Sequence, residues 1–310
     1  MENKCKICGN AENNEELVVK ENQFGTGKKF TYFKCADCGC LQITDFPKEM
    51  SQYYPNDKYY SYNMKTKKNA KIKKIIKTFL RYCYFHNFIP KNFRYFKVFP
   101  FLKAFEGLRI TASSAILDVG CGSGSLLKQM TYCGYKNLTG IDPFNDKDIV
   151  TNDFSIFKTD ICNYQPDKKF DVVMFNHSFE HIAEQHETLA AAHNLLTDTG
   201  YLIIRIPVCD CFAYRKYGVN WRAWDAPRHF FLHSTNSIAG LTKKHNFILV
   251  KQFCDSSEGQ FTESEDIEKY AFRYQHTLLS KKRSKLLHQQ AEILNEMYDG
   301  DTACFILKKQ

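Results

Sequence analysis

The sequence predicts an α/β protein in which a small cysteine-rich module precedes a doubly wound, seven-stranded sheet. Short apolar runs alternate with amphipathic stretches from about residue 111 onward, a glycine-rich turn follows the first run, and four cysteines stand in two pairs near the N-terminus. These observations divide the chain into a module at 1–60, a basic helical connector at 61–110 and an α/β domain at 111–310, with a helical insertion at about 262–298.

The composition is that of an ordinary globular protein with an excess of positive charge. The net charge is +9, and no apolar run approaches the ~20 residues that span a bilayer. The first residues lack the apolar core of a secretory signal. Apart from the four paired ones, the thirteen cysteines are scattered through apolar strands and loops. We therefore expect a cytoplasmic protein with one metal site and several structural thiols.

Four cysteines form two Cys-x-x-Cys pairs, each followed by Gly and separated by 26 residues: Cys5, Cys8, Cys35 and Cys38. Each pair makes a tight turn that points two thiolates inward, and four thiolates in a tetrahedron suit a structural Zn²⁺. Leu17–Val19 and Phe30–Phe33 alternate like the strands of a small ribbon. We expect one zinc per chain in this zinc ribbon. The alternative is two unrelated thiol pairs, and Cys40 could compete with Cys38 for the metal.

The positive charge of the chain belongs to the connector. Residues 58–105 contain thirteen Lys or Arg and no acid. Within 65–84 an apolar stripe recurs at helical spacing: Ile72, Ile75, Ile76, Phe79, Leu80 and Cys83. We expect this stripe to pack on the body of the protein and the basic face to be solvated. Two alternatives stay open: contact of the helix with an anionic membrane, and a landing site for a polyanion or a phosphate-bearing substrate.

A short apolar run, a turn with three glycines and an amphipathic stretch follow one another across 116–127. This order predicts a buried strand, a turn whose backbone a ligand can approach, and the start of a helix. Gly120, Gly122 and Gly124 alternate, unlike the Gly-x-Gly-x-x-Gly of dinucleotide sites. Asp118 would repel a pyrophosphate, whereas it would favour an ammonium or sulfonium group. The motif resembles the first motif of class I methyltransferases that use S-adenosylmethionine.

Two further acids stand where this resemblance requires them, each at the end of a predicted strand. Asp142 lies 22 residues past Gly120, where an acid can accept both ribose hydroxyls of a nucleoside. Asp160 ends the third strand, and the resemblance implies that it meets the adenine amino group while the Ile161 N–H meets the ring. The alternative role for Asp160 is to cap a helix.

The fourth strand, 170–175, leads into Asn176 and then into Glu-His-Ile at 180–182, which resembles the fourth motif of the same enzymes. Strand ends of an open α/β sheet border the ligand crevice, so Asn176 is expected beside the cofactor. Three more predicted strands complete a Rossmann-like sheet: 200–207, 247–253 and 303–307.

The cysteine pairs and the Pro-Arg-His-Phe segment at 227–230 together resemble a subset of methyltransferases with an N-terminal zinc-binding module. Members of that subset often modify sugars or precursors of cell-surface polysaccharides. The resemblance therefore implies methyl transfer to a sugar, nucleotide sugar or glycan precursor in polysaccharide biosynthesis. Pro207-Val208 stands where relatives often have Pro-Asn, so a substrate contact by that Asn does not carry over.

A hydroxyl acceptor, or a carbon beside a carbonyl, must lose a proton during methyl transfer, and a histidine can take it. His177 and His181 follow the fourth strand, and His229 lies in a polar loop with Asp225. We expect His181 to be the general base, with His229 and then His177 as the next candidates. The alternative for His181 is structural: it would order the loop or pack under the adenosine.

Other functions fit parts of the sequence. An RNA methyltransferase would hold nucleic acid with the cysteine module and the basic helix. No Asn-Pro-Pro-Tyr-type tetrapeptide follows the fourth strand, which argues against methylation of an exocyclic base nitrogen but not of a ribose. A different small-molecule O-methyltransferase and a cofactor-binding scaffold without catalysis complete the alternatives.

Overall fold

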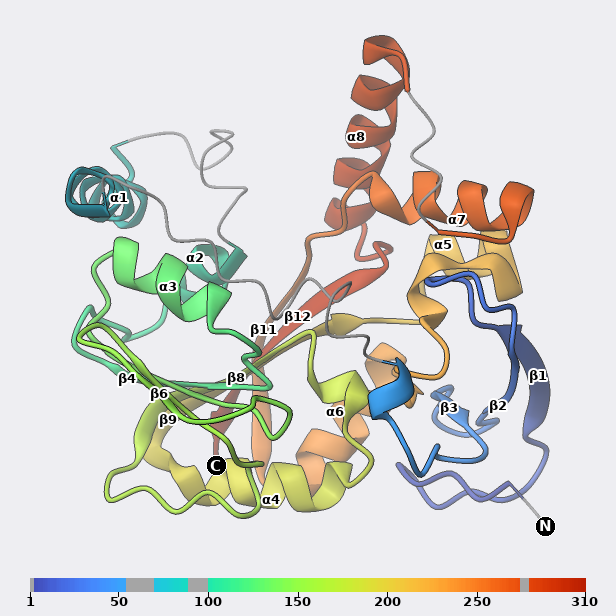
Figure 1. Ribbon diagram of the computed structural model, residues 1–310, viewed down its shortest axis with the longest axis horizontal. Helices are drawn as coiled ribbons and strands as arrows, with labels where there is room; N and C mark the ends of the chain where they lie inside the picture. Colours follow the sequence, from blue (N-terminus) through green and yellow to red (C-terminus); the bar gives the residue numbers. More distant parts are fainter. Residues whose placement is uncertain (1–2, 54–69, 89–99, 274–278) are drawn as a thin grey trace. The chain divides into compact units, whose positions relative to one another are not determined.

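The computed structural model describes residues 3–53, 70–88, 100–273 and 279–310 (Figure 1). The chain forms two compact units, each assembled from separate stretches. The first unit contains Met1–Pro55, Phe179–Leu189 and Arg205–Phe305, and the second contains Asn56–Ser178, Ala190–Ile204 and Ile306–Gln310. Among the described residues, none of the helices combines the length and apolarity that crossing a bilayer requires.

The main sheet confirms the predicted doubly wound α/β fold. Its eight strands follow the order β11-β12-β9-β8-β4-β5-β7-β6. Seven of them lie where the sequence predicts strands: β4 (Ala115–Val119), β5 (Asn137–Ile141), β7 (Ser155–Phe157), β8 (Phe170–Asn176), β9 (Leu196–Pro207), β11 (Phe247–Cys254) and β12 (Thr302–Lys309). The eighth, β6 (Ile149–Val150), pairs antiparallel with β7 and is too short to show a periodic pattern. The division between the units falls within β9 and β12.

The core of the second unit is a run of parallel strands. β4 pairs with β5 on one side and with β8 on the other, and β5 pairs in turn with β7. Ile116 and Leu117 of β4 are fully buried, which explains why this strand is a continuous apolar run and not an alternating one. α3 (Ser125–Tyr132) buries Leu127 and Met130. The short α2 (Pro100–Phe105) places Phe105 edge-on to Tyr135.

Helix α1 (Ala70–Phe85) packs beside α3 (Figure 1), and basic side chains that the sequence predicts to be solvated lie at the contact. The Lys77 ammonium lies 5.2 Å from the centroid of the Tyr132 ring, and the Arg81 guanidinium lies 5.0 Å from that of Tyr135. Ile75 and Phe79, which we expected to be buried, are exposed. The predicted orientation was therefore wrong for these residues, whereas Cys83, the last residue of the stripe, is buried as expected. The part of the predicted helix at 65–69 lies outside the described residues.

Local chemistry accounts for this orientation. Two tyrosine rings of the α3 region face α1, and a cation over an aromatic face gains about 0.5–1 kcal/mol at an exposed site. Gly134 also leaves room for Thr78, because a Cβ at Gly134 would lie 2.9 Å from the Thr78 hydroxyl oxygen. Lys74 extends the contact by pairing with Asp153 at 3.0 Å. The surface that α1 meets therefore suits basic and small polar side chains.

The first unit contains a four-stranded antiparallel sheet. Its order is β1 (Glu15–Lys20), β2 (Lys29–Lys34), β3 (Leu41–Ile43) and β10 (Phe231–Leu232). The two ribbon strands predicted at 17–19 and 30–33 lie in β1 and β2. The last strand comes from far along the chain, so residues near 230 complete the sheet that the N-terminal segment begins. Tyr32 of β2 packs edge-on against Trp224, with ring centroids 5.1 Å apart.

Helices and 3-10 helices make up much of the rest of the first unit. Ser234 caps α6, because its hydroxyl accepts a hydrogen bond from the Ser237 N–H at 2.9 Å. α7 and α8 occupy the predicted insertion. The helices of the first unit are α5 (Phe212–Tyr217), α6 (Thr235–Lys244), α7 (Gly259–Tyr270) and α8 (Lys281–Glu296), and its 3-10 helices are η1 (Ser51–Tyr53), η4 (Phe179–His181), η5 (Gly218–Asn220) and η6 (Arg222–Trp224). α4 (Gln185–Leu195) begins in the first unit and ends in the second.

Replacing Gly140 with Ala is expected to lower the free energy of unfolding by about 1–3 kcal/mol, as overpacking does in a dense core. A Cβ there would lie 2.5 Å from Cys121 Sγ and 2.8 Å from Leu127 Cδ1. Gly240→Ala is the matched control, because no atom lies within 4 Å of its added Cβ and the residue is inside α6. That variant should be neutral or up to about 1 kcal/mol more stable. Equal denaturation midpoints for the two variants would contradict the packing argument.

Candidate functional site

Two buried carboxylates lie at the carboxyl ends of neighbouring parallel strands in the second unit. Asp118 is in β4, and Asp142 follows β5 directly; the register places Asp118 opposite Gly140. Burial raises the pKa of Asp118 to about 8, with a further contribution from the charge of Asp142. Burial also raises the pKa of Asp142. Two neighbouring buried acids ionise more readily when a positive charge lies beside them. The site therefore favours a cationic ligand.

The glycine turn has the conformation that the sequence predicts. Gly120, Gly122 and Gly124 have φ values of +71°, +52° and +79°, in the left-handed region that favours glycine. A Cβ at Gly120 would lie 2.5 Å from the Ser178 Cβ, so any other residue there would collide with the chain after β8. The Gly122 N–H donates to Asp142 Oδ2 at 2.8 Å. Asp142 therefore fixes the turn in addition to any contact with a ligand.

Asp160 caps the turn that follows it. Its Oδ1 accepts hydrogen bonds from the backbone N–H groups of Cys162 and Asn163 at 2.9 and 3.0 Å, and its Oδ2 accepts one from the Asn163 side chain at 2.7 Å. The alternative that we kept was the cap of a helix, whereas the residues after Asp160 form a turn and not a helix. Ionised carboxylates have further lone pairs, so a contact of Asp160 with adenine stays a prediction. Ile161 beside it is buried.

Two histidines of the first unit lie against each other, with ring centroids 4.7 Å apart. His181 belongs to η4, and its Nδ1 is 2.8 Å from the Arg228 carbonyl oxygen. His229 Nδ1 is 2.7 Å from the Ala223 carbonyl oxygen. A carbonyl only accepts, so each Nδ1 carries the hydrogen and each Nε2 keeps a lone pair. Burial lowers the pKa of both rings, that of His229 to about 3, so both are neutral.

Two acidic side chains lie near the Nε2 atom of His229. Asp225 Oδ2 lies 3.7 Å away and Glu180 Oε1 3.9 Å away. Glu180 is fully buried, and burial raises its pKa to about 8. Glu180 is part of the Glu-His-Ile motif, but we assigned it no role from the sequence. Its position next to His181 was the one signal that could have identified it as a site residue.

Arg228 is fully buried and connects the polar loop to the N-terminal segment of the first unit. Its guanidinium bonds both oxygens of Asp225, at 2.5 and 3.1 Å, and lies 3.5 Å from Glu21 Oε1. It also donates to the Tyr53 carbonyl oxygen at 3.1 Å. Burial alone would raise the pKa of Asp225, but Arg228 outweighs it and holds that pKa well below its usual range. Asp225 therefore stays ionised next to a neutral His229.

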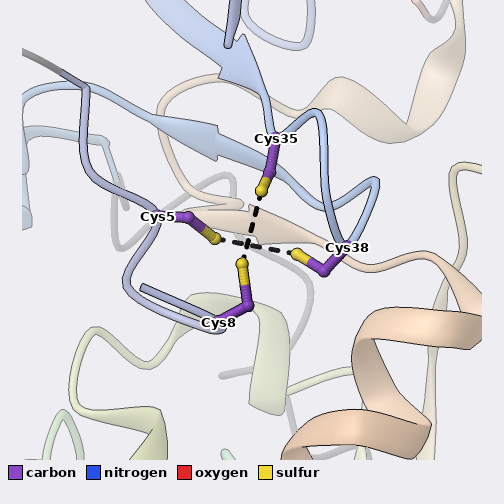
Figure 2. Close-up of side chains that lie close together, drawn as sticks. All are labelled: Cys5, Cys8, Cys35 and Cys38. Atoms are coloured by element: carbon purple, nitrogen blue, oxygen red, sulfur yellow. Dashed lines mark hydrogen bonds between the residues drawn. The ribbon is translucent and has the colours of Figure 1, made fainter. Parts of the chain in front are cut away.

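The four paired cysteines converge on one point, as Figure 2 shows. The Sγ atoms of Cys5 and Cys38 are 3.7 Å apart, and those of Cys8 and Cys35 are 3.4 Å apart. All four sulfurs lie within 4.8 Å of one another. A tetrahedral Zn²⁺ with Zn–S bonds of about 2.3 Å separates its sulfurs by about 3.8 Å, so this donor set fits zinc.

The sequence places the glycine turns of the two cysteine pairs correctly. Gly9 and Gly39 have positive φ values, and their N–H groups donate to the carbonyls of Cys5 and Cys35 at 2.9 and 3.0 Å. The Sγ atom of Cys40 is directed elsewhere, 3.5 Å from the Leu41 carbonyl oxygen. Cys40 is thus not one of the four clustered sulfurs.

The predicted site residues fall into two groups. Those expected to bind the cofactor all lie in the second unit: Asp118, Gly120, Gly122, Gly124, Asp142, Asp160, Ile161 and Asn176. The first unit holds His181, His229 and the four cysteines. His177 lies in the second unit with a left-handed φ of +55°, directly after Asn176, the last residue of β8.

Comparisons with known proteins identify one matching family and several similar solved structures. The family described as "Methyltransferase domain" matches residues 93–252. A search of curated protein sequences found no significant match. A solved S-adenosylmethionine-dependent methyltransferase from Archaeoglobus fulgidus is 19% identical and covers 76% of this chain and 94% of its own, with a TM-score of 0.44. A possible histamine N-methyltransferase from Thermotoga maritima is 15% identical and covers 77% and 98%, with a TM-score of 0.46.

The family match spans more than half of the 310 residues and includes β4 through β11 up to residue 252. It therefore contains the glycine turn and the acids at the strand ends, which fit a ligand with a positive charge. The chain belongs to the methyltransferase-domain family and is an S-adenosylmethionine-dependent methyltransferase.

Proposed function

We propose that this enzyme methylates a sugar or a cell-surface glycan precursor, such as a nucleotide sugar, at a hydroxyl or at a carbon beside a carbonyl. The observation that carries this proposal is the pair of buried neutral histidines, His181 and His229, with the carboxyl groups of Glu180 and Asp225 within 4 Å of the His229 Nε2 atom. A neutral imidazole can take up a proton through its Nε2 lone pair. A hydroxyl group, or a carbon beside a carbonyl, must lose a proton when it is methylated. The four-cysteine module combined with this methyltransferase domain supports the choice of a sugar acceptor by resemblance.

The cofactor roles follow from the second unit. S-adenosylmethionine supplies a methyl group on a positively charged sulfur, which is already electrophilic. Asp118 stabilises the positive charge of the ligand, and Asp142 accepts the ribose hydroxyls while it holds the glycine turn. Asp160 and the Ile161 N–H contact the adenine, and Asn176 borders the site at the end of β8.

The acceptor roles follow from the first unit. His181 is the last residue of η4 and follows the end of β8 by five residues in the chain. Its Nε2 takes the proton that the acceptor loses as the new bond to the methyl carbon forms. The ionised Asp225 then stabilises the charge that develops on the histidine pair. General base catalysis of this kind typically contributes about 10²–10⁴-fold to the rate.

A structural zinc ion completes the proposal. Four thiolates fill a tetrahedral coordination sphere, so the metal would have no open position for a substrate. Its role would be to hold the N-terminal turns of the first unit in place. The cytoplasmic location that we infer rests on the sequence, in which four of the thirteen cysteines stand in metal-binding pairs.

Replacing Asp118 with Asn is expected to weaken S-adenosylmethionine binding by about 1.5–3 kcal/mol at pH 8.5, because a charged partner is lost. In the wild type a cationic ligand favours the ionised carboxylate, whose pKa in the free protein is about 8. Affinity should therefore rise with pH, by up to about tenfold per unit below pH 8, and level off above it. Equilibrium dialysis between pH 6.5 and 9 measures both effects.

The Asn variant provides its own control for this pH dependence. Titration of the ligand's amino group is common to both proteins, so the ratio of their dissociation constants isolates Asp118. If that ratio were independent of pH across this window, the assignment of Asp118 to the cationic part of the ligand would be wrong.

Replacing His181 with Ala is expected to lower turnover by about 10²–10⁴-fold while the affinity for S-adenosylmethionine stays nearly unchanged. The assay follows a labelled methyl group onto nucleotide sugars, lipid-linked sugars and RNA, and we expect label on a sugar substrate. His288→Ala is the matched control, because His288 is partly exposed on α8. Unchanged turnover would remove His181 from the mechanism, and label on RNA alone would refute the sugar acceptor.

Elemental analysis of protein purified without added metal is expected to find one zinc per chain. Cys8→Ser should abolish it, because losing a ligand costs more than the roughly 10–100-fold that removal of an outer-shell partner costs. Thermal unfolding should also begin at a lower temperature. Cys162→Ser is the control, since this cysteine is exposed and outside the cluster. Wild-type protein without zinc, or a Cys8→Ser variant that retains it, would contradict the assignment.

A further inference from the structure

Helix α1 presents an apolar face to solvent. Ile75 and Phe79 are 70% and 63% exposed, and Ile76 and Tyr82 are each about half exposed. These side chains share one face because they recur at helical spacing. Beyond the end of the helix, Phe88 is also exposed. A cluster of large apolar side chains on a surface helix is typical of an interaction site.

The opposite face of α1 is fixed to the second unit, so the apolar face is held outward. Lys77 and Arg81 stack on Tyr132 and Tyr135, and the Thr78 hydroxyl donates to the Tyr132 carbonyl oxygen at 3.4 Å. Turning the apolar side chains inward would break these contacts. The exposure is therefore a property of how α1 packs on α3.

The same helix is strongly basic. Its sixteen residues contain five Lys or Arg and no acid. Residues 58–105 carry thirteen bases and no acid, whereas the rest of the chain has 30 bases and 34 acids. The positive charge is thus concentrated in the segment that contains the exposed apolar face, and it is not spread over the enzyme.

We propose that α1 docks this enzyme on an anionic lipid bilayer surface, with its apolar face at the boundary between headgroups and acyl chains. A helix of this composition lies in the interfacial plane, where burial of the apolar side chains and attraction to anionic lipids add together. A polyanion such as RNA would use the charge but leave the isoleucines and the phenylalanine exposed. A second copy of this chain would bring two basic segments together, and like charges repel.

The test is co-sedimentation of full-length, zinc-loaded protein with phosphatidylcholine vesicles that contain or lack phosphatidylglycerol. Binding is expected to the phosphatidylglycerol vesicles at low salt and to fall as salt rises. Ile75→Ser/Phe79→Ser should weaken it by roughly tenfold or more, since two apolar side chains lose their burial. Lys71→Gln/Lys73→Gln should weaken it by about fivefold per lysine.

Matched controls come from elsewhere on the chain. Ile248→Ser/Val250→Ser changes two residues of β11 that are 52% and 50% exposed, and Lys281→Gln/Lys282→Gln changes two exposed lysines at the start of α8. Both controls should bind vesicles like the wild type. Because all substituted apolar residues are exposed, each variant should also keep its folding stability.

Three results would overturn the proposal. The first is no binding to phosphatidylglycerol vesicles at low salt. The second is vesicle binding that Ile75→Ser/Phe79→Ser leaves intact, which would assign it to charge alone, as in binding to RNA. The third is a dimer in analytical ultracentrifugation that the same double variant dissociates, which would assign the apolar face to a second copy of the chain.

Discussion

The hydrogen bond from the Gly122 N–H to the Asp142 carboxylate is the constraint on which the proposed cofactor site depends. It ties the turn after β4 to the end of β5, so two neighbouring strands and the glycines between β4 and α3 keep one geometry. The Asp142 carboxylate also accepts from the Phe144 N–H, which fixes the chain on its other side. A buried acid in this position is costly by itself. Asp118 adds a second one, and a cationic ligand is the partner that would offset both.

The buried acids of this protein have different pKa values because their surroundings differ. Asp225 stays ionised because the Arg228 guanidinium bonds both of its oxygens. Asp118 and Glu180 are equally buried, and burial raises the pKa of each to about 8. Beside the two histidines, the ionised Asp225 opposes the effect of burial, which by itself makes the rings resist protonation. The second unit holds acids that ionise most readily when a positive charge arrives.

Much of the fold could be predicted because the relevant patterns are local. An apolar run, alternate glycines and paired cysteines each determine a few residues of backbone, and the structure contains the corresponding strand, turn and thiol cluster. The orientation of α1 could not be predicted, since periodicity defines the apolar stripe but not which face meets Tyr132. The sequence also carried no sign that Arg228 connects the polar loop to the N-terminal segment, because its partner Glu21 lies 207 residues away in the chain. Asp160 shows a further limit: a strand-end acid can cap the next turn and face a ligand from the same position.

The most direct test of the account is a calorimetric titration of S-adenosylmethionine into the zinc-loaded, full-length protein. The account predicts saturable binding at one site per chain, lost or strongly weakened in Asp142→Ala because the turn and the ribose contact disappear together. Absence of any binding heat in folded wild-type protein at several temperatures, or undiminished affinity in Asp142→Ala, would contradict it.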